Sequence, residues 1–121
     1  MLQKMSEAEM EIMELVWKMA TPCTSAEIQK ELPADKNWKP TTLLTFLSRL
    51  VEKGLLTAEK QGKQNLYRPL VTREEYLASE TRSFLDEMHG GSLSSFIAAL
   101  SGGKKLTEDE LCELRRWLES Q

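Results

Sequence analysis

The spacing of apolar residues predicts three short helices in the first half of the chain. Within residues 6–20, 24–32 and 40–53, apolar side chains recur every three or four positions, so each segment has one apolar face when it is helical. A serine or threonine followed three residues later by glutamate, the pattern of a capping box, opens the first two helices. Pro40 suits the first turn of the third helix, where its missing N–H costs nothing.

After residue 54 the apolar positions alternate with a period of two. Residues 55–60 and 65–70 have the pattern of strands, and the stretch Gln-Gly-Lys-Gln between them is typical of a tight turn. Three helices followed by a hairpin indicate a helix-turn-helix unit with a β-wing, which we assign to residues 1–71. Its expected core, with Trp17 and Trp38 near the edges, consists of Ile12, Leu15, Val16, Ile28, Leu43, Phe46, Leu47, Leu50 and Leu66.

The last part of the chain, residues 72–121, has the pattern of three further short helices separated by glycine-containing breaks. Such helices bury little apolar surface by themselves, so we expect them to pack against the same segment of a second chain. The expected fold class is therefore mainly α with a small β-hairpin, in which a winged helix-turn-helix domain precedes a helical dimerisation domain. The residues expected in the dimer interface are Phe84, Leu85, Met88, Phe96, Ile97, Leu100, Leu114 and Trp117.

The formal net charge of −3 conceals a strongly basic middle section. Residues 36–68 carry seven basic and two acidic side chains, whereas residues 1–35 and 69–121 each have a net charge of −4. A protein that binds phosphates does not need to be basic overall if its positive charges are concentrated on one surface. The middle section is therefore a candidate nucleic-acid surface, and an ordinary solvated basic surface is the alternative.

The third predicted helix has an unusual outer face. On a helical wheel Thr41 and Thr45 lie opposite the apolar face, with Thr42 and Arg49 at one flank. Short hydroxyl side chains allow close approach to a duplex and can contact phosphates or base edges in a major groove. This indicates a recognition helix for double-stranded DNA, and threonines merely tolerated on a solvated face are the alternative. The DNA-binding candidates are Lys39, Thr41, Thr42, Thr45 and Arg49 in the helix and, as weaker candidates, Lys60, Lys63 and Arg68 in the wing.

Other functional classes have little support in the sequence. The single histidine, His89, precedes two glycines in a predicted helix-ending turn, and the chain has neither a glycine-rich phosphate loop after a strand nor a nucleophile elbow. We therefore do not expect this protein to be an enzyme. Cys23 and Cys112 lack the spacing of a metal site or disulfide framework, so we expect no metal and no cofactor. Both cysteines are expected to be buried or half-buried, and a redox or intersubunit role for Cys112 is the alternative. A winged-helix module for protein–protein contact is the second alternative, and it would expose apolar or mixed-sign side chains at the candidate positions.

The beginning of the chain bears on its location. The first residues, MLQKMSEAEMEIME, are more acidic and more polar than a signal peptide. No apolar stretch has the length of a membrane span. We therefore expect a cytoplasmic protein that does not insert into a membrane.

Six stretches of the chain carry a resemblance to known proteins, and they are SEAEMEIMELVWK, TSAEIQKEL, WKPTTLLTFLSRLVEKGLL, YRPL, SFLDEMHGGSLSSFIAAL and LTEDELCELRRWLE. Together these stretches resemble the BlaI/MecI family, repressors of β-lactamase and methicillin-resistance genes. The resemblance implies a homodimeric winged-helix repressor that binds an inverted repeat, often built on TACA/TGTA half-sites. It also implies release when a membrane-embedded sensor metalloprotease, or a protease that it triggers, leads to cutting of the dimerisation region.

Two features depart from the pattern of that family. The family is typically cut at an Asn-Phe pair in the short C-terminal helix, where this chain has Ala99-Leu100, the possible cleavage site. Lys39 stands where a serine N-cap is common, so the recognition helix is expected to be less well capped by roughly 1 kcal/mol. Copper-responsive relatives carry closely spaced cysteines near the C-terminus, which this chain lacks, so metal sensing is not expected.

Overall fold

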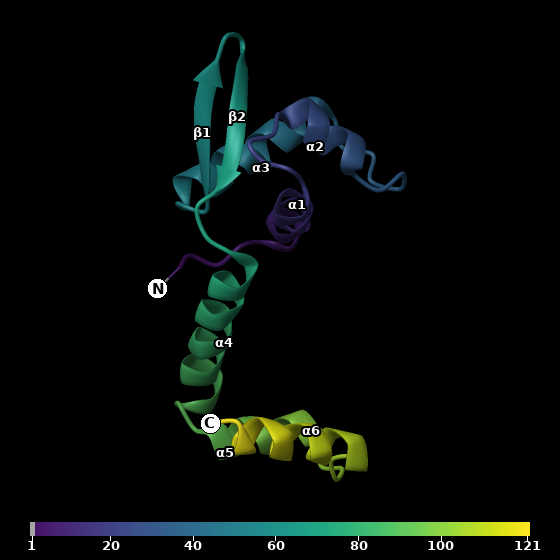
Figure 1. The fold of residues 1–121 in the computed structure, drawn as a ribbon, viewed down its shortest axis with the longest axis vertical. Coiled ribbons are helices and arrows are strands. Elements are labelled where there is room, and N and C mark those ends of the chain that lie inside the picture. The colour runs from purple at the N-terminus through teal and green to yellow at the C-terminus, as the bar shows by residue number, and fades with distance from the viewer. Residues whose placement is uncertain (1) are drawn as a thin grey trace. The chain divides into compact units, whose positions relative to one another are not determined.

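The computed structural model describes residues 2–121, which form six helices and one two-stranded antiparallel sheet (Figure 1). The first part contains, in order, α1 (Glu7–Lys18), α2 (Ser25–Glu31), α3 (Pro40–Glu52), β1 (Leu56–Gln61) and β2 (Gln64–Pro69). The second part contains α4 (Arg73–His89), α5 (Leu93–Ser101) and α6 (Glu108–Glu119). Three helices, a hairpin and three further helices confirm the expected fold class, a winged helix followed by a helical C-terminal region.

The chain divides into two compact units, Met1–Thr81 and Arg82–Gln121, which we call the winged-helix unit and the helical unit. The first turns of α4 belong to the winged-helix unit because Tyr76 is buried in its core. Helix α4 is continuous from Arg73 to His89, so a single helix joins the two units.

Capping boxes fix the starts of four of the described helices. They are formed by Ser6 with Glu9, Thr24 with Glu27, Thr72 with Glu75, and Thr107 with Glu110. In each box the hydroxyl accepts from the backbone N–H of the glutamate, and the carboxylate accepts from the backbone N–H of the capping residue. Hydrogen bonds from the backbone and hydroxyl of Thr107 hold the pKa of the exposed Glu110 carboxyl below its usual value. These local interactions explain why the helix starts could be predicted.

Helix α3 begins without such help. Lys39 is its N-cap residue and makes no side-chain capping hydrogen bond, while Pro40 follows at the first helical position. The expectation that this helix lacks a side-chain cap at Lys39 is therefore confirmed.

The β-hairpin closes through a two-residue turn. Gln61 pairs with Gln64, which leaves Gly62 and Lys63 between the strands. Gly62 has φ of 65° and Lys63 does not have a positive φ, as a type II′ turn requires. This turn matches the right-handed twist of the flanking strands, and the hairpin extends away from α1 (Figure 1).

The core of the winged-helix unit contains most of the side chains expected there. Leu15 and Phe46 pack against it while half-buried, as do Trp17 and Trp38. Its buried members are Met5, Ile12, Met13, Val16, Cys23, Ile28, Leu43, Leu47, Leu50, Leu55, Leu56, Tyr67 and Tyr76.

The prediction that Leu66 belongs to this core is wrong, because Tyr67 takes that place. The Cys23 N–H donates to the Tyr67 carbonyl at 3.1 Å, and the Tyr67 N–H donates to the Cys23 carbonyl at 2.8 Å. This isolated bridge holds the Tyr67 position against the helices. Since side chains alternate along a strand, Leu66 faces the other side of the hairpin and is only half-buried.

The two cysteines lie in different surroundings. Cys23 is buried, as expected, and burial together with the nearby Glu27 charge raises the pKa of its thiol. A thiol of raised pKa is a packing group and a poor nucleophile. Cys112 is exposed on α6, contrary to the expectation.

None of the helices in residues 2–121 has the length and apolar character that crossing a membrane requires. The same residues contain no cluster of three or more His, Cys, Asp and Glu side chains that could hold a metal ion.

Replacing Lys39 by serine should stabilise the winged-helix unit. A serine hydroxyl at the N-cap can accept from a backbone N–H of the first turn, which lacks a side-chain cap in this protein. We expect a gain of about 1 kcal/mol and a rise in Tm of about 4 °C, measured by urea and thermal unfolding. Lys39→Ala removes the same charge without adding a cap and is the control. Equal stability of the two variants would contradict the proposed benefit of the cap.

Candidate nucleic-acid interface

Three leucines set the rotation of α3 about its own axis. Leu43, Leu47 and Leu50 are spaced four and three residues apart, so they share one face of the helix, and each is at most 1% exposed. Thr41 and Thr45 are consequently turned away from the core and are exposed. The outer face expected from the helical wheel is thus free of contacts with the core of its own chain.

The threonines of this face do not all present the same chemistry. The Thr45 hydroxyl donates to the Thr41 carbonyl at 3.0 Å, which occupies its hydrogen within the helix. Toward an outside partner Thr45 therefore offers an acceptor oxygen and a methyl group. This combination suits the amino group of adenine or cytosine and the methyl group of thymine. Thr42 is half-buried and less accessible than Thr41 and Thr45.

Arg49 lies beside the ring of Phe46, which in turn packs against Trp38, and the sequence analysis assigned neither ring to the site. Its guanidinium carbon is 5.6 Å from the centroid of the Phe46 ring, and the Phe46 and Trp38 centroids are 5.2 Å apart. The Lys36 ammonium is 6.0 Å from the Trp38 centroid. Cation–π attraction of this kind limits where an exposed cation can point. We call Trp38 and Phe46 the aromatic pair.

The aromatic pair is itself held in place from two sides. Gln29 on α2 donates through Nε2 to the Trp38 carbonyl at 2.9 Å, and Lys36 forms an ion pair with Glu11 on α1 at 3.1 Å. The loop before α3 is therefore tied to both preceding helices. Trp38 and Phe46 both lie within the basic section of the sequence, residues 36–68, and this position could have indicated that they belong to the site.

The wing places its three cations on different sides of the hairpin. Lys63 lies in the turn, and Lys60 and Arg68 lie on β1 and β2, all exposed. Lys60 is on the same face of the ribbon as the buried Tyr67, because its partner Asn65 is two residues from Tyr67. Arg68 is the residue after Tyr67 and points to the opposite face. Lys60 and Arg68 therefore do not form one basic patch.

A partly buried ion pair anchors the C-terminal end of α3. The Lys53 ammonium, on the C-cap residue of α3, lies 2.6 Å from Oε1 of Glu9, which is only 1% exposed. Burial acts to raise the pKa of Glu9, but hydrogen bonds from Lys53 and Ser6 outweigh it and hold that pKa below its usual value. Glu9 is therefore ionised at neutral pH. The carboxylate that caps the start of α1 also holds the end of α3 through Lys53.

The sequence of this chain is similar to those of known proteins over nearly its whole length. The model of the penicillinase repressor family matches residues 5–120. The chain belongs to the penicillinase repressor (BlaI/MecI) family. It is 33% identical to the penicillinase repressor of Bacillus licheniformis over 98% of this chain and 91% of that protein. It is 29% identical to the methicillin resistance regulatory protein MecI of Staphylococcus aureus strain N315, over 95% of this chain and 93% of MecI.

Two solved structures of BlaI resemble this family member in fold. The DNA-binding domain of the repressor BlaI, solved in solution, has a TM-score of 0.54 and 35% identity, covering 63% of this chain and 94% of that one. The monomeric form of Bacillus licheniformis BlaI, solved in complex with the blaP half-operator, has a TM-score of 0.52 and 34% identity, covering 63% and 92%.

The helical unit of this penicillinase repressor family member exposes much of its apolar surface. Among the residues expected in a dimer interface, Leu85 is buried, and Phe96, Ile97 and Leu114 are half-buried. The other four are 46–67% exposed, and they are Phe84, Met88, Leu100 and Trp117. In a single chain these side chains leave apolar area in contact with water.

An aromatic cluster surrounds the end of α4. The ring centroid of His89 is 5.6 Å from that of Phe84 and 5.7 Å from that of Phe96. Phe84 and Phe96 meet edge to face at 6.4 Å, and Nδ1 of His89 lies 2.9 Å from the Ser95 hydroxyl. His89 therefore has a structural position between α4 and α5, in the helix-ending turn that the sequence indicated.

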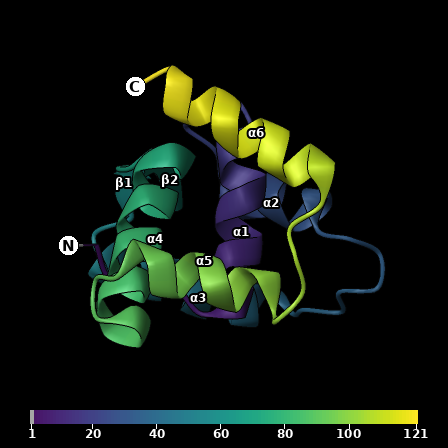
Figure 2. The same cartoon turned by 90° about the horizontal axis from the view of Figure 1, so that it is seen from below.

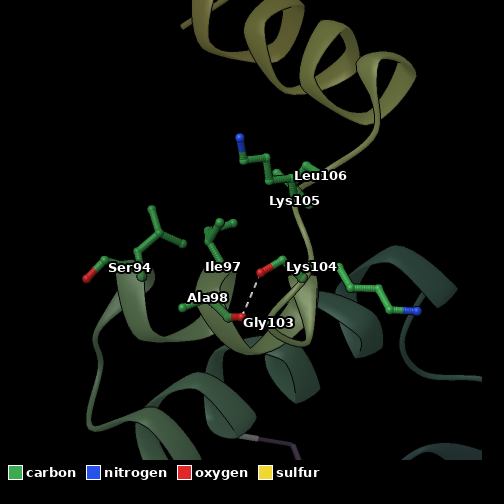
Figure 3. Close-up of a pocket in the computed structure, with 9 residues that line it drawn as sticks. Ser94, Ile97, Ala98, Gly103, Lys104, Lys105 and Leu106 are labelled. Carbon is green, nitrogen blue, oxygen red and sulfur yellow. Dashed lines mark hydrogen bonds between the residues drawn. The ribbon is translucent and has the colours of Figure 1, made fainter.

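Two open hollows flank α5. One, of about 930 Å³, lies between α5 and the following loop, where Ile97 and Leu106 line it (Figure 3). Helix α6 runs back in the direction opposite to α5 (Figure 2). The second hollow, of about 330 Å³, is lined by residues of both helices, including Ile97, Leu100 and Trp117. Ala99 and Leu100, the possible cleavage site, are exposed in the last turns of α5.

Proposed function

We propose that this chain is a DNA-binding transcriptional repressor that acts in the cytoplasm as a homodimer on an inverted-repeat operator. The observation that carries the proposal is the outer face of α3, where Thr41 and Thr45 are exposed because the leucines of the opposite face are buried. The BlaI structure in complex with the blaP half-operator, at 34% identity, supports the same use of this fold here.

The N-terminal half of α3 enters a major groove in this proposal. Thr41 and Thr45, with Thr42 at the flank, contact base edges through acceptor oxygens and methyl groups. Lys39 and Arg49 neutralise phosphates, which contributes affinity without sequence preference. In the wing, Lys63 and one of Lys60 and Arg68 reach along the backbone, since those two residues lie on opposite faces of the hairpin.

Dimerisation raises the affinity for the operator in this proposal. The exposed apolar side chains of the helical unit support a second copy as the partner that covers them. Two recognition helices then occupy successive major grooves about 34 Å apart. Because binding of the second subunit is intramolecular, affinity rises through effective concentration. Repression is steric, since the dimer occupies the promoter.

Cutting of the helical unit relieves repression in this proposal. Ala99 and Leu100 are exposed, but they lie within α5. A protease binds its substrate in an extended form, so α5 has to open locally before a membrane sensor protease, or one that it triggers, can act. The cut separates Leu100, Leu114 and Trp117 from the rest of the dimer interface and leaves every proposed DNA contact in place.

Substitutions on α3 test the recognition helix. Arg49→Ala should weaken binding to specific and random duplexes alike and reduce the salt slope by about one unit. Thr45→Ala should weaken operator binding by about tenfold and leave random DNA unaffected, as loss of one base contact does. Both effects are measured by fluorescence anisotropy at several salt concentrations.

Thr81→Ala and Arg82→Ala remove the same side-chain types from exposed positions of α4 and are the matched controls. If Thr45→Ala and Arg49→Ala bind the operator as tightly as these controls at fixed salt, the recognition-helix assignment fails. Operator binding by none of the chains, the wild type included, would favour the protein-contact module.

Disruption of the helical unit tests the dimer. Phe96→Asp, and separately a chain that ends at Ala99, should be monomeric in analytical ultracentrifugation because each loses apolar contact area. Operator affinity should fall by about 100-fold or more, because the second subunit no longer binds intramolecularly. Affinity for a single half-site should stay constant. Ser120→Asp adds the same charge at the exposed C-terminal end and should remain dimeric. A stable Phe96→Asp dimer contradicts the interface.

A further inference from the structure

The segment before α1, residues 2–6, is bound to the first turns of α4. We call it the N-terminal segment. The Met5 N–H donates to the Tyr76 hydroxyl at 2.9 Å, and both residues are buried. The Leu2 N–H donates to the Ser79 hydroxyl at 3.1 Å. An ion pair of 3.5 Å between Lys4 and Glu80 continues this contact along α4.

The same segment is bound to the C-terminal end of α3. The Lys53 ammonium donates to the Lys4 carbonyl at 2.9 Å and to Oε1 of Glu9 at 2.6 Å. That carboxylate oxygen also accepts from the Ser6 N–H at 2.7 Å. The N-terminal segment therefore connects the recognition helix to the helix that leads into the helical unit.

The chemistry of this connection is costly if its purpose is stability alone. Glu9 is buried, and its second oxygen, Oε2, has no hydrogen-bond partner in the described structure. Lys53 keeps 25% of its side chain exposed, so the cost falls mainly on the Glu9 carboxylate. A well-packed apolar pair is often at least as stable as such an ion pair, because it avoids the cost of removing charge from water. What an ion pair adds is a fixed geometry, since its hydrogen bonds are directional.

In the proposed dimer, the direction of α4 determines the separation of the two recognition helices. Helix α4 has 17 residues and is therefore about 25 Å long. A tilt of about 10° at its base displaces the far end by about 4 Å, which is close to the rise of one base pair. A small loosening of α4 against α3 is thus enough to change the separation of two recognition helices that are joined through the helical units.

We propose that the N-terminal segment, together with the Glu9–Lys53 ion pair, determines the half-site spacing that the dimer accepts. By locking the base of α4 to the end of α3, it restricts binding to inverted repeats of one separation. Residues of this connection touch no DNA and act through the position of α3. The inference rests on the proposed function.

The test uses the full chain and the inverted repeat that the wild type selects from a pool of random duplexes. Derivatives of this duplex have the spacer changed by one or two base pairs, and a single half-site serves as reference. The affinity of the wild type should fall by about 100-fold when the spacing is changed, because the two subunits can then no longer bind their half-sites simultaneously.

The variant for the test is the double substitution Glu9→Leu with Lys53→Met, which removes the ion pair without leaving one buried charge unpaired. It should bind the half-site like the wild type and lose less than about tenfold when the spacing is changed. The double substitution Glu14→Leu with Arg73→Met removes another ion pair of 2.6 Å, between α1 and the start of α4, and is the matched control. It should keep the spacing preference.

Each outcome separates the two proposals. Selection of no duplex by the wild type contradicts the proposed function. Unchanged spacing preference in the Glu9→Leu/Lys53→Met variant, or equal relaxation in the control, overturns the inference while the proposed function stands. If the double variant loses half-site binding through misfolding, Tyr76→Phe decides, because it removes only the hydroxyl that holds Met5. It should relax the spacing, and an unrelaxed preference overturns the inference.

Discussion

The burial of three leucines on one side of α3 is the constraint on which the rest of this molecule depends. Full burial of a leucine side chain contributes roughly 2 kcal/mol, so Leu43, Leu47 and Leu50 together contribute about 6 kcal/mol. This is comparable with the entire stability of a small domain. A rotation of α3 that turned Thr41 and Thr45 inward would forfeit most of it. The core therefore fixes the outer face, and the residues of that face are free to serve a partner.

The two ends of α3 are held very differently. Its C-terminal end is fixed by the ion pair of Lys53 with the buried Glu9, whereas its N-terminal end has no side-chain cap at Lys39. The end expected to enter the groove is thus the less stabilised one. A lysine at the N-cap forgoes about 1 kcal/mol of capping and gains a cation next to the proposed phosphate contacts. In the proposed function, Lys39 therefore exchanges helix stability for phosphate binding.

Local patterns in the sequence were sufficient for the elements but not for the contacts between them. Capping boxes and apolar periodicity predicted the helices, and Gly62 marked the turn, because each depends on residues a few positions apart. The errors involve contacts across long separations. Cys23 and Tyr67, and likewise Glu9 and Lys53, are 44 residues apart, so no local period reveals that they meet. The sequence analysis therefore placed Leu66 in the core wrongly and did not predict the ion pair of Glu9 with Lys53.

The candidate site was predictable to a similar extent. The exposed threonine face followed from helical periodicity, whereas the aromatic pair beside Arg49 depends on how the loop before α3 folds back. The separation of Lys60 and Arg68 follows from strand register, which is set by the turn and by the Cys23 bridge. Charge counts over a segment cannot distinguish one basic patch from two opposite faces.

Footprinting on DNA upstream of the protein's own gene, combined with dimethyl sulfate interference, tests most directly whether the outer face of α3 reads a major groove. The reagent methylates guanine N7, which lies in that groove. The account predicts two protected segments centred about 10 base pairs apart, with interference in both and loss of protection as salt rises. Absence of protection, or protection without interference at any major-groove position, would contradict it.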